Sequence, residues 1–260
     1  MNIPNIHLAI MQPLGYVHSL GFLDQARYFR WQFRRLGAKV TLAKNRLRHD
    51  AVNFVFGAHL GLPLDWATRH DCVIVNLEQL GDGGARVSPE YLQLLRNAPV
   101  VDYDADNLLA YGGDASRVVL LPYGHAPYLA QPAPALEDRP IDLLFFGSMN
   151  DRRRAFIQRV EALGVGMACF DSPLYGDERD TFIRQAKAVL NCHFYESSRF
   201  EQARAFQCLS MGTAFISERG PGTRPSPAFE PSVFWLDPTG DDIELSFGQA
   251  SRTPPAYEAA

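Results

Sequence analysis

Short apolar runs that alternate with longer amphipathic stretches are the feature that most constrains how this chain folds. A run of about four to eight apolar residues is typical of a buried strand, and apolar positions spaced three and four apart are typical of a helix. Strands that alternate with helices form a mostly parallel sheet with helices packed on it. In the first half the sequence predicts strands at Ile6–Met11, Val52–Phe56, Cys72–Asn76, Val100–Val101 and Val118–Leu121, and helices at Ser19–Leu36 and Pro89–Arg96.

The same alternation restarts after a proline-rich segment, residues 129–140, whose composition is typical of a linker. The fold class is therefore predicted to be α/β, with two Rossmann-like domains at residues 1–128 and 129–250. Two prolines and several small residues predict a disordered tail at residues 251–260. In the second half the sequence predicts strands at Ile141–Phe146, Met167–Phe170, Val189–Asn191 and Ala214–Ser217, and helices at Asp151–Leu163, Glu178–Gln185 and Phe200–Met211.

Composition and charge exclude several classes of protein. The 260 residues carry a formal net charge of −4 and no long basic run, so nucleic acid is not an expected partner, because phosphate binding needs a positive face. The chain begins without a signal-peptide pattern, and no apolar run approaches the ~20 residues of a membrane span, so we expect a cytoplasmic protein. Four cysteines lie far apart in the sequence and are expected to be free thiols rather than zinc ligands: Cys72, Cys169, Cys192 and Cys208.

Four segments carry a resemblance to a known family. They are Leu121–His125, Asp142–Arg154, Ala186–Tyr195 and Phe200–Glu218. Their order of strand, turn, strand and glycine-terminated helix resembles the donor domain of group 1 GT-B glycosyltransferases, and it is closer still to the CgeB-like branch. The resemblance covers residues 118–218 and reaches the first half only through the architecture.

This resemblance implies a GT-B-like fold, in which the two Rossmann-like domains face each other across a cleft. It implies a metal-independent transferase without a cofactor, which moves a sugar from a nucleoside-diphosphate sugar to a glycan, metabolite or protein acceptor, alone or beside a protein partner. Two features depart from the family, because Gln207 stands where group 1 members usually have Glu and the C-terminal part is short. The alternative is a degenerate module of the same fold that binds a nucleotide or a partner without catalysis.

The second half contains the residue types that hold a diphosphate without a metal. Small residues in a turn let the backbone approach a phosphate, arginine and lysine supply charge, and carboxylates bind ribose hydroxyls. Simpler interpretations are a solvated basic helix face, arginines paired with nearby acids, a satisfied histidine after a strand, and an acid that caps a helix. The candidate donor-binding residues are Gly147, Ser148, Asn150, Arg152, Arg153, Lys187, His193, Tyr195, Glu201, Arg204, Gln207 and Glu218.

Two residues of the first half are candidates for removing the proton of the acceptor. His18 lies in the loop after the first strand, and its ordinary pKa is close to neutral pH. Glu78 follows another strand, and inverting transfer is favoured if either residue is the base. A simple loop histidine and an acid at a helix start are the alternatives. Tyr16, Asp102 and Asn107 are expected to line the acceptor side of the cleft.

The segment Asp102–Asp106 also matches the Asp-x-Asp metal motif of GT-A glycosyltransferases, in which two carboxylates hold a divalent ion against a diphosphate. A metal-dependent transferase that uses Asp102 and Asp104 is therefore a second alternative. We favour the interpretation that no metal binds there. Asp104 or Asp106 is then expected to cap a short helix at Asn107–Tyr111.

Overall fold

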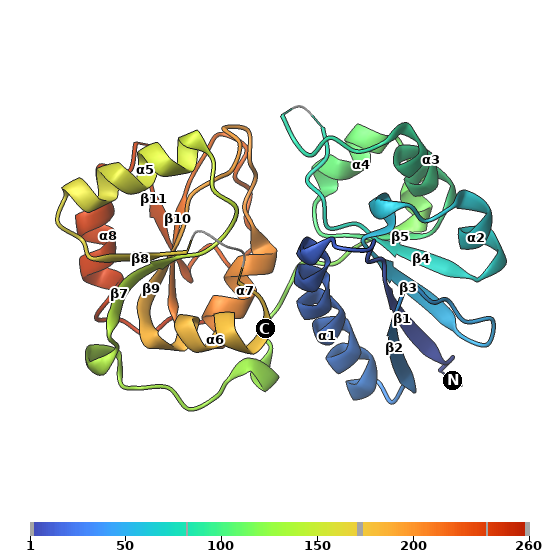
Figure 1. Cartoon of the computed structure of the whole chain (residues 1–260), viewed down its shortest axis with the longest axis horizontal. Coiled ribbons are helices and arrows are strands. Elements are labelled where there is room, and N and C mark those ends of the chain that lie inside the picture. Colours follow the sequence, from blue (N-terminus) through green and yellow to red (C-terminus); the bar gives the residue numbers. More distant parts are fainter. Residues whose placement is uncertain (1–2, 82, 171–173, 238, 258–260) are drawn as a thin grey trace. The chain divides into compact units, whose positions relative to one another are not determined.

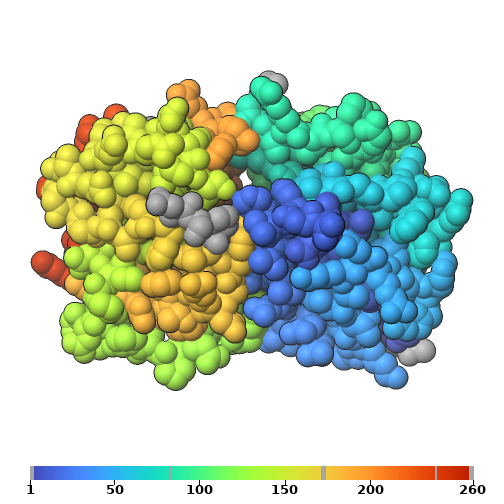
Figure 2. Space-filling model, viewed as in Figure 1, coloured from blue at the N-terminus to red at the C-terminus, as the bar shows by residue number. Residues whose placement is uncertain are grey.

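A computed structural model describes residues 3–81, 83–170, 174–237 and 239–257. The chain divides into two compact units between Pro122 and Tyr123. Each unit contains one parallel β-sheet with helices on both faces, as the alternation of strands and helices predicts (Figure 1). Figure 2 shows one face of the chain in space-filling form, with unit 1 coloured from blue to green and unit 2 from green to red.

Unit 1 has a six-stranded parallel sheet in the order β2-β1-β3-β4-β5-β6. Helix α1 covers one face, where Phe29 contacts Phe56 with ring centroids 5.3 Å apart. Helices α2, α3 and α4 cover the other face around Tyr91 and Leu94, which are both buried (Figure 1). The elements are β1 (Ile6–Ile10), α1 (Leu20–Arg35), β2 (Val40–Lys44), β3 (Val52–Phe56), α2 (Leu64–Arg69), β4 (Cys72–Val75), α3 (Pro89–Asn97), β5 (Val100–Asp102), α4 (Ala105–Tyr111) and β6 (Val118–Leu120).

Unit 2 has a five-stranded parallel sheet in the order β11-β10-β9-β7-β8. Helices α5 and α8 share one core cluster, in which Phe156 and Ile243 are buried, and α6 and α7 lie on the opposite face (Figure 1). The elements are β7 (Ile141–Phe145), α5 (Asp151–Ala162), β8 (Met167–Cys169), α6 (Gly176–Gln185), β9 (Ala186–Asn191), α7 (Gln202–Ser210), β10 (Ala214–Glu218), β11 (Val233–Leu236) and α8 (Ile243–Ala250).

The strand order of each sheet reverses direction at one point. In unit 1 the chain passes from β1 outward to β2 and then returns to place β3 on the other side of β1. In unit 2 it passes from β7 to β8 and returns to place β9 on the other side of β7. Parallel sheets bind ligands at such a switch point, beyond the carboxyl ends of the two diverging strands. The loops after β1 and β3, and after β7 and β9, are therefore where a site is expected.

The structure corrects one detail at the start of α1. Ser19 begins the helix predicted at Ser19–Leu36, and serine is a common helix cap, but its side chain makes no capping hydrogen bond. A short 3-10 helix, Val17–Ser19, leads directly into α1, and the Ser19 hydroxyl donates instead to the carbonyl of Met11. In contrast, Asp104 caps α4, as one of the two predicted alternatives, by accepting from the backbone N–H of Asp106.

Four elements carry too weak a local signal to be predicted. Helix α2 has only six residues. Strand β2 is an edge strand whose residues are all at least partly exposed, so its apolar run is short. Strand β11 and helix α8 have four and eight residues, and both are fixed by packing against β10.

Part of the segment that was expected to be disordered is packed into unit 2. The Tyr257 side chain is buried, and its hydroxyl donates to the carbonyl of Tyr123 at 3.2 Å. Its ring stacks on Phe229 with centroids 5.3 Å apart. The sequence analysis missed this because the packing of one aromatic side chain outweighs a composition of prolines and small residues that is typical of a disordered tail. Residues 258–260 lie outside the described part of the chain.

The cysteines and the helices agree with a simple globular protein. All four cysteines are free, and three of them, Cys72, Cys192 and Cys208, are buried. Burial raises the pKa of each of these three thiols to about 12, so they stay protonated at neutral pH. None of the helices in the described part of the chain combines the length and the apolar character needed to cross a lipid bilayer.

The proline-rich segment before β7 is fastened to unit 2 by Arg139. The Arg139 guanidinium is buried and donates to the carbonyl of Ala186 at 2.9 Å, to the hydroxyl of Thr213 at 3.0 Å and to the carbonyl of Gly212 at 3.2 Å. Burial lowers the pKa of Arg139 from its ordinary value. These bonds make the end of the expected linker a structural part of the second unit.

We expect Arg139→Ala to lower the free energy of unfolding of unit 2 by about 2–4 kcal/mol, because buried acceptors lose hydrogen bonds from a charged donor. Chemical denaturation measures the change. Arg154→Ala is the matched control, because Arg154 is exposed and its ionic partner, Asp151, lies on the surface of α5, so we expect a change below about 0.5 kcal/mol. Equal effects of the two substitutions would contradict the role given to Arg139.

Candidate functional site

The switch point of unit 2 gathers most of the residues predicted to bind a donor. Gly147, Ser148 and Asn150 follow β7, His193 follows β9, and Glu218 ends β10. Arg152 and Arg153 belong to the first turn of α5, and Glu201 and Arg204 lie at the start of α7. The carboxyl ends of three neighbouring strands, one of which carries Glu218, therefore meet two helix starts that carry three arginines and Glu201.

Arg152 and Glu218 form a bidentate ion pair at this edge. The Arg152 guanidinium donates to the two carboxylate oxygens of Glu218 at 2.6 and 2.9 Å and to the carbonyl of His193 at 2.8 Å. Glu218 also accepts from the backbone N–H of His193. The hydrogen bond with Glu218 raises the pKa of Arg152 from its ordinary value. Glu218 is almost fully buried, and Arg152 is its one ionic partner among the described residues.

Arg153 and Arg204 share a single carboxylate, that of Glu201. Arg153 donates to Glu201 at 3.1 Å, and Arg204 lies 3.0 Å from the other oxygen of the same group. Arg153 also donates to the carbonyls of Cys192 at 3.0 Å and Ser148 at 2.8 Å. Burial lowers the pKa of Arg153, while the hydrogen-bonded carbonyls and the carboxylate compensate for its lost hydration.

Gly147 fits closely against both of these arginines. A Cβ atom at this position would lie 3.0 Å from Nη2 of Arg204 and 3.2 Å from Nη1 of Arg153. The backbone φ is 143°, a conformation that favours glycine. The turn after β7 therefore depends on glycine for both conformation and space. Asn150 ends the turn by capping α5, since its side chain accepts from the N–H of Arg153 at 2.9 Å.

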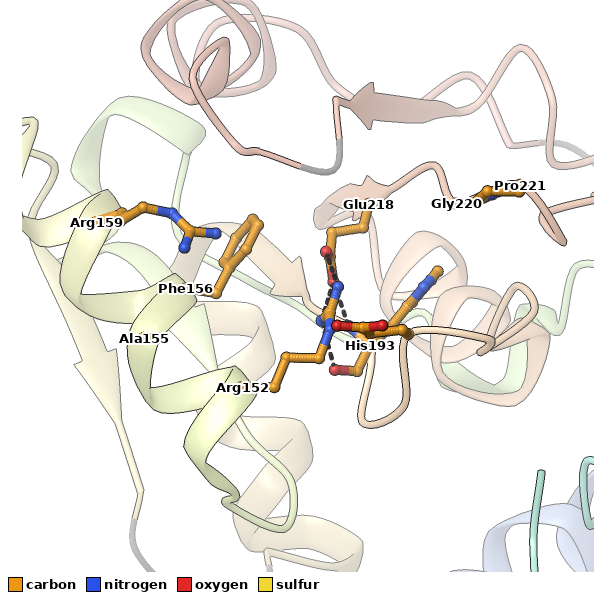
Figure 3. A pocket seen from close by; sticks show the side chains of 9 residues that line it. Arg152, Ala155, Phe156, Arg159, His193, Glu218, Gly220 and Pro221 are labelled. Carbon is orange, nitrogen blue, oxygen red and sulfur yellow. Dashed lines mark hydrogen bonds and ion pairs between the residues drawn. The ribbon is translucent and has the colours of Figure 1, made fainter. Parts of the chain in front are cut away.

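A pocket of about 500 Å³ opens beside the Arg152–Glu218 pair, between α5 and the loop after β10. Figure 3 shows Arg152 extending from α5 toward Glu218, with His193 beside the pair. His193 is 1% exposed, and its Nε2 atom has no hydrogen-bond partner among the described residues. Burial lowers the pKa of His193, so its imidazole is neutral at pH 7. Both charged and neutral polar groups thus border this pocket.

Three of the predicted donor residues lie outside the arginine group. Lys187 is near the amino end of β9, the opposite edge of the sheet, and pairs with Asp142 at 2.7 Å. Gln207 is buried in the middle of α7, and Tyr195 is 42% exposed in the loop after β9. Lys187 thus forms the pair with a nearby acid that was the alternative to a donor-binding role.

A buried hydrogen-bond network holds the loop after β4 in unit 1. The Asp102 carboxylate accepts from Asn76 at 2.9 Å and from Asn107 at 2.8 Å, and Tyr91 donates to Asn76 at 2.9 Å. Both asparagines also donate to the carbonyl of Glu78 at 3.0 Å. Desolvation raises the pKa of Asp102, while these donors favour its charged form. Asp102 and Asn107, expected to line an acceptor cleft, are instead fully buried supports of the Glu78 loop.

Glu78 itself faces a histidine that the sequence did not single out. Its carboxylate lies 3.5 Å from Nε2 of His59, in the short 3-10 helix after β3. The His59 ring makes edge contacts with Phe22 and Tyr91 at centroid distances of 5.8 and 5.6 Å. Desolvation lowers the pKa of His59, and the charge of Glu78 opposes this shift.

The loop after β1 brings Tyr16 close to the same carboxylate. Desolvation raises the pKa of Tyr16, and the negative charge of Glu78 adds to this shift. The ring of His18 packs edge-on against Tyr16 at a centroid distance of 5.4 Å. Tyr16, His59 and Glu78 thus flank the switch point of unit 1 and form a group that is able to accept and donate protons.

His59 and Asn191 are the residues that sequence reasoning missed. Asn191 ends β9, where it accepts from Arg204 at 2.9 Å and donates to Ser217 at 3.0 Å. A signal was present in both cases, because each lies at or just after the carboxyl end of a predicted strand, the criterion that drew attention to His193. For metals, the described residues contain no group of three or more His, Cys, Asp or Glu side chains placed to hold an ion.

Comparisons with known proteins place this geometry in context. No protein-family model matches the sequence. The uncharacterized protein L140 of Acanthamoeba polyphaga mimivirus is 24% identical over 143 residues, which are 52% of this chain and 44% of that protein. The match therefore spans less than half the length of this relative.

Among solved structures, a glycosyltransferase from Rickettsia africae ESF-5 superposes with a TM-score of 0.52 at 11% identity, covering 95% of this chain and 89% of that one. A UDP-forming α,α-trehalose-phosphate synthase from Burkholderia vietnamiensis gives a TM-score of 0.48 at 11% identity, with 94% and 71% covered. An α1,3-fucosyltransferase gives 0.47 at 12%, with 97% and 82% covered. The chain thus shares with the Rickettsia protein a fold of two Rossmann-like α/β units, and the predicted fold class is confirmed.

Because burial lowers the pKa of His193, stability is expected to depend on pH. Below the ordinary histidine pKa of about 6.5 the unfolded chain binds a proton that the folded chain resists, so the free energy of unfolding falls as the pH is lowered. The slope from one such group is at most about 1.4 kcal/mol per pH unit. Chemical denaturation of His193→Gln between pH 7.5 and 5.5 should show a shallower dependence than the native protein.

His49→Gln provides the control for this measurement, because His49 is exposed. Its denaturation curves should follow the pH dependence of the native protein. If His193→Gln also follows the native dependence, the buried imidazole does not resist protonation.

Proposed function

We propose that this protein is a glycosyltransferase that moves a sugar from a nucleoside-diphosphate sugar to an acceptor hydroxyl without a metal ion. The observation that carries the proposal is the likeness of fold to a solved glycosyltransferase over 95% of this chain and 89% of the other. The arginine group at the switch point of unit 2 supports it, because parallel sheets bind ligands at that position. The order of motifs in residues 118–218 favours the group 1 and CgeB-like branch.

Unit 2 is assigned to the donor in this proposal. Sugar transfer breaks the bond between the anomeric carbon and the diphosphate oxygen, and the leaving diphosphate keeps the electron pair. Arg152, Arg153 and Arg204 supply guanidinium groups able to stabilise this developing charge by bidentate hydrogen bonds. The pocket beside Arg152, which is bordered by charged side chains and by the neutral His193, offers room for another part of the donor.

Unit 1 is assigned to the acceptor, which is a glycan, a metabolite or a protein. The acceptor oxygen forms the new bond to the anomeric carbon and gives up its proton to a base. Glu78, paired with His59, suits this step because a carboxylate and an imidazole in contact can take up and pass on a proton. Tyr16 lies near Glu78, and His18 packs against Tyr16; both are proposed to contact the acceptor.

The rival function is a module that binds a nucleotide or a partner without catalysis. Its support is that each arginine of the candidate donor site already pairs with an acid of the protein, and that Gln207 replaces the usual acid. In both cases the protein is proposed to act in the cytoplasm, where its free cysteines remain reduced.

The first test is thermal unfolding with a panel of nucleotides and nucleotide sugars, with and without EDTA. A ligand that binds only the folded state at 100 times its Kd stabilises it by about 2.7 kcal/mol, so one nucleoside diphosphate should raise the Tm, with or without EDTA. Arg204→Gln should lose most of this rise, whereas the exposed Arg154→Gln should keep it. No rise with any nucleotide argues against a donor site, and a rise that EDTA removes indicates a metal-dependent site.

The second test is turnover, measured as release of nucleoside diphosphate from the donor that binds. Glu78→Gln and His59→Gln should each lower kcat by about 10²- to 10⁴-fold, the usual contribution of general acid–base catalysis, while donor binding stays unchanged. His49→Gln, an exposed histidine in the same unit, should keep full activity. Donor binding without turnover in the native protein would favour the binding module, and near-native rates in both variants would remove the pair from catalysis.

A further inference from the structure

The charges at the switch point of unit 2 do not balance. Arg152 and Glu218 match one to one, with two hydrogen bonds between them. Arg153 and Arg204 together face one carboxylate, that of Glu201. Two positive charges therefore share one negative charge, and this pair of arginines can accommodate more negative charge than Glu201 provides.

Both guanidinium groups are held in place independently of Glu201. Arg153 is fixed by hydrogen bonds to the carbonyls of Cys192 and Ser148 and stacks over Phe194 at 5.2 Å. Arg204 is fixed by Asn191, and it stacks over Phe146 at 5.2 Å. If the carboxylate moved away, the two cations would remain oriented toward the same point.

In the described part of the chain, fewer contacts hold the Glu201 side chain than hold either arginine. It stands at the N-cap position of α7, but its side chain makes no capping hydrogen bond. Among the described residues, its carboxylate pairs only with Arg153 and Arg204. Its side chain is 28% exposed, against 3% for Arg153 and 15% for Arg204, so it is the most accessible member of the group.

Glu201 stays deprotonated while its carboxylate lies between the two arginines. Burial alone would raise its pKa, but the guanidinium groups of Arg204 and Arg153 lower the pKa of Glu201 below its ordinary value. The group is therefore a carboxylate at neutral pH. It places two negative oxygens 3.1 and 3.0 Å from two guanidinium groups, the arrangement in which arginines hold phosphate oxygens.

Gly147 brings the backbone of the turn after β7 against the same two guanidinium groups. Any larger residue would place its Cβ against the two guanidinium groups, at 3.0 and 3.2 Å. Glycine lets the backbone after β7 approach the same point, as backbone does where it contacts a phosphate. Two cations, a close backbone turn and a displaceable carboxylate thus converge at one position.

We propose that Glu201 is an internal stand-in for a phosphate group, and that the diphosphate of the ligand binds between Arg153 and Arg204 by displacing it. The inference rests on the proposed donor site and adds a residue that sets its affinity and selectivity. A ligand must carry more negative charge than one carboxylate to displace Glu201, so the site favours diphosphates over acetate or chloride. The displaced carboxylate moves into solvent, where it regains its hydration.

The test measures binding of inorganic pyrophosphate by calorimetry and by the rise in Tm at low salt. Glu201→Gln removes the competing charge and keeps the shape of the side chain, so we expect it to bind pyrophosphate at least about tenfold more tightly than the native protein. Adding Arg204→Gln to this variant should abolish the gain. Glu230→Gln is the matched control, since Glu230 pairs with Arg219 on the surface, and its affinity for pyrophosphate should equal that of the native protein.

Unchanged or weaker binding in Glu201→Gln would overturn the proposal and would make Glu201 either a ligand contact or a structural partner of the arginines. If Glu201→Gln folds poorly alone, it is refolded with pyrophosphate, which should restore the native Tm by filling the vacated position. Failure of pyrophosphate to restore folding would also overturn the proposal. Sugar turnover reports on the proposed function separately: tighter pyrophosphate binding without turnover keeps the inference, and turnover without tighter binding removes only the inference.

Discussion

The burial of Arg153 is the interaction on which the candidate site of unit 2 depends. An arginine that is 3% exposed stays charged, so the surrounding chain has to replace its hydration with hydrogen bonds. It does so with carbonyls at the ends of β7 and β9 and with the carboxylate of Glu201 at the start of α7. The same requirement brings two loops and a helix start together, and these elements form the edge where a ligand would bind.

Unit 1 uses a buried carboxylate in the corresponding way. Asp102 ends β5 without exposure to solvent, and its charge is compensated by the amides of Asn76 and Asn107. These amides also donate to the Glu78 carbonyl. The hydrogen bonds that compensate the buried Asp102 carboxylate therefore come from side chains that also fix the loop of Glu78. Glu78 remains partly exposed and faces His59, which leaves a reactive pair on a rigid support.

These two supports bear differently on the choice between an enzyme and a binding module. The arginine group of unit 2 is satisfied internally, which a protein that only preserves its fold would also require. The pair in unit 1 is not needed for the sheet, because both of its members are partly exposed and lie beyond the strand ends. The contact between His59 and Glu78 at a switch point favours an enzyme over a binding module. The buried amides of Asn76 and Asn107 fix the loop of Glu78, whose side chain remains partly exposed.

The sequence by itself determined most of the strands and helices in the two series, because their apolar periodicity is local, whereas β2, α2, β11 and α8 were not predicted. It also determined that Gly147, Arg152, Arg153, His193, Glu201, Arg204 and Glu218 lie at strand ends or helix starts. Only the tertiary structure decided the order of the strands, and with it which loops are neighbours. Pairing of β9 with β7 joins Arg153 to Glu201 across 48 residues, and pairing of β3 with β1 makes the loop that carries His59 a neighbour of the loop that carries Tyr16. The same parallel pairing places Lys187 at the opposite edge, away from the arginines. The strand order depends on how whole faces of the sheet and helices pack over long sequence separations, and a local pattern of residues does not determine this packing.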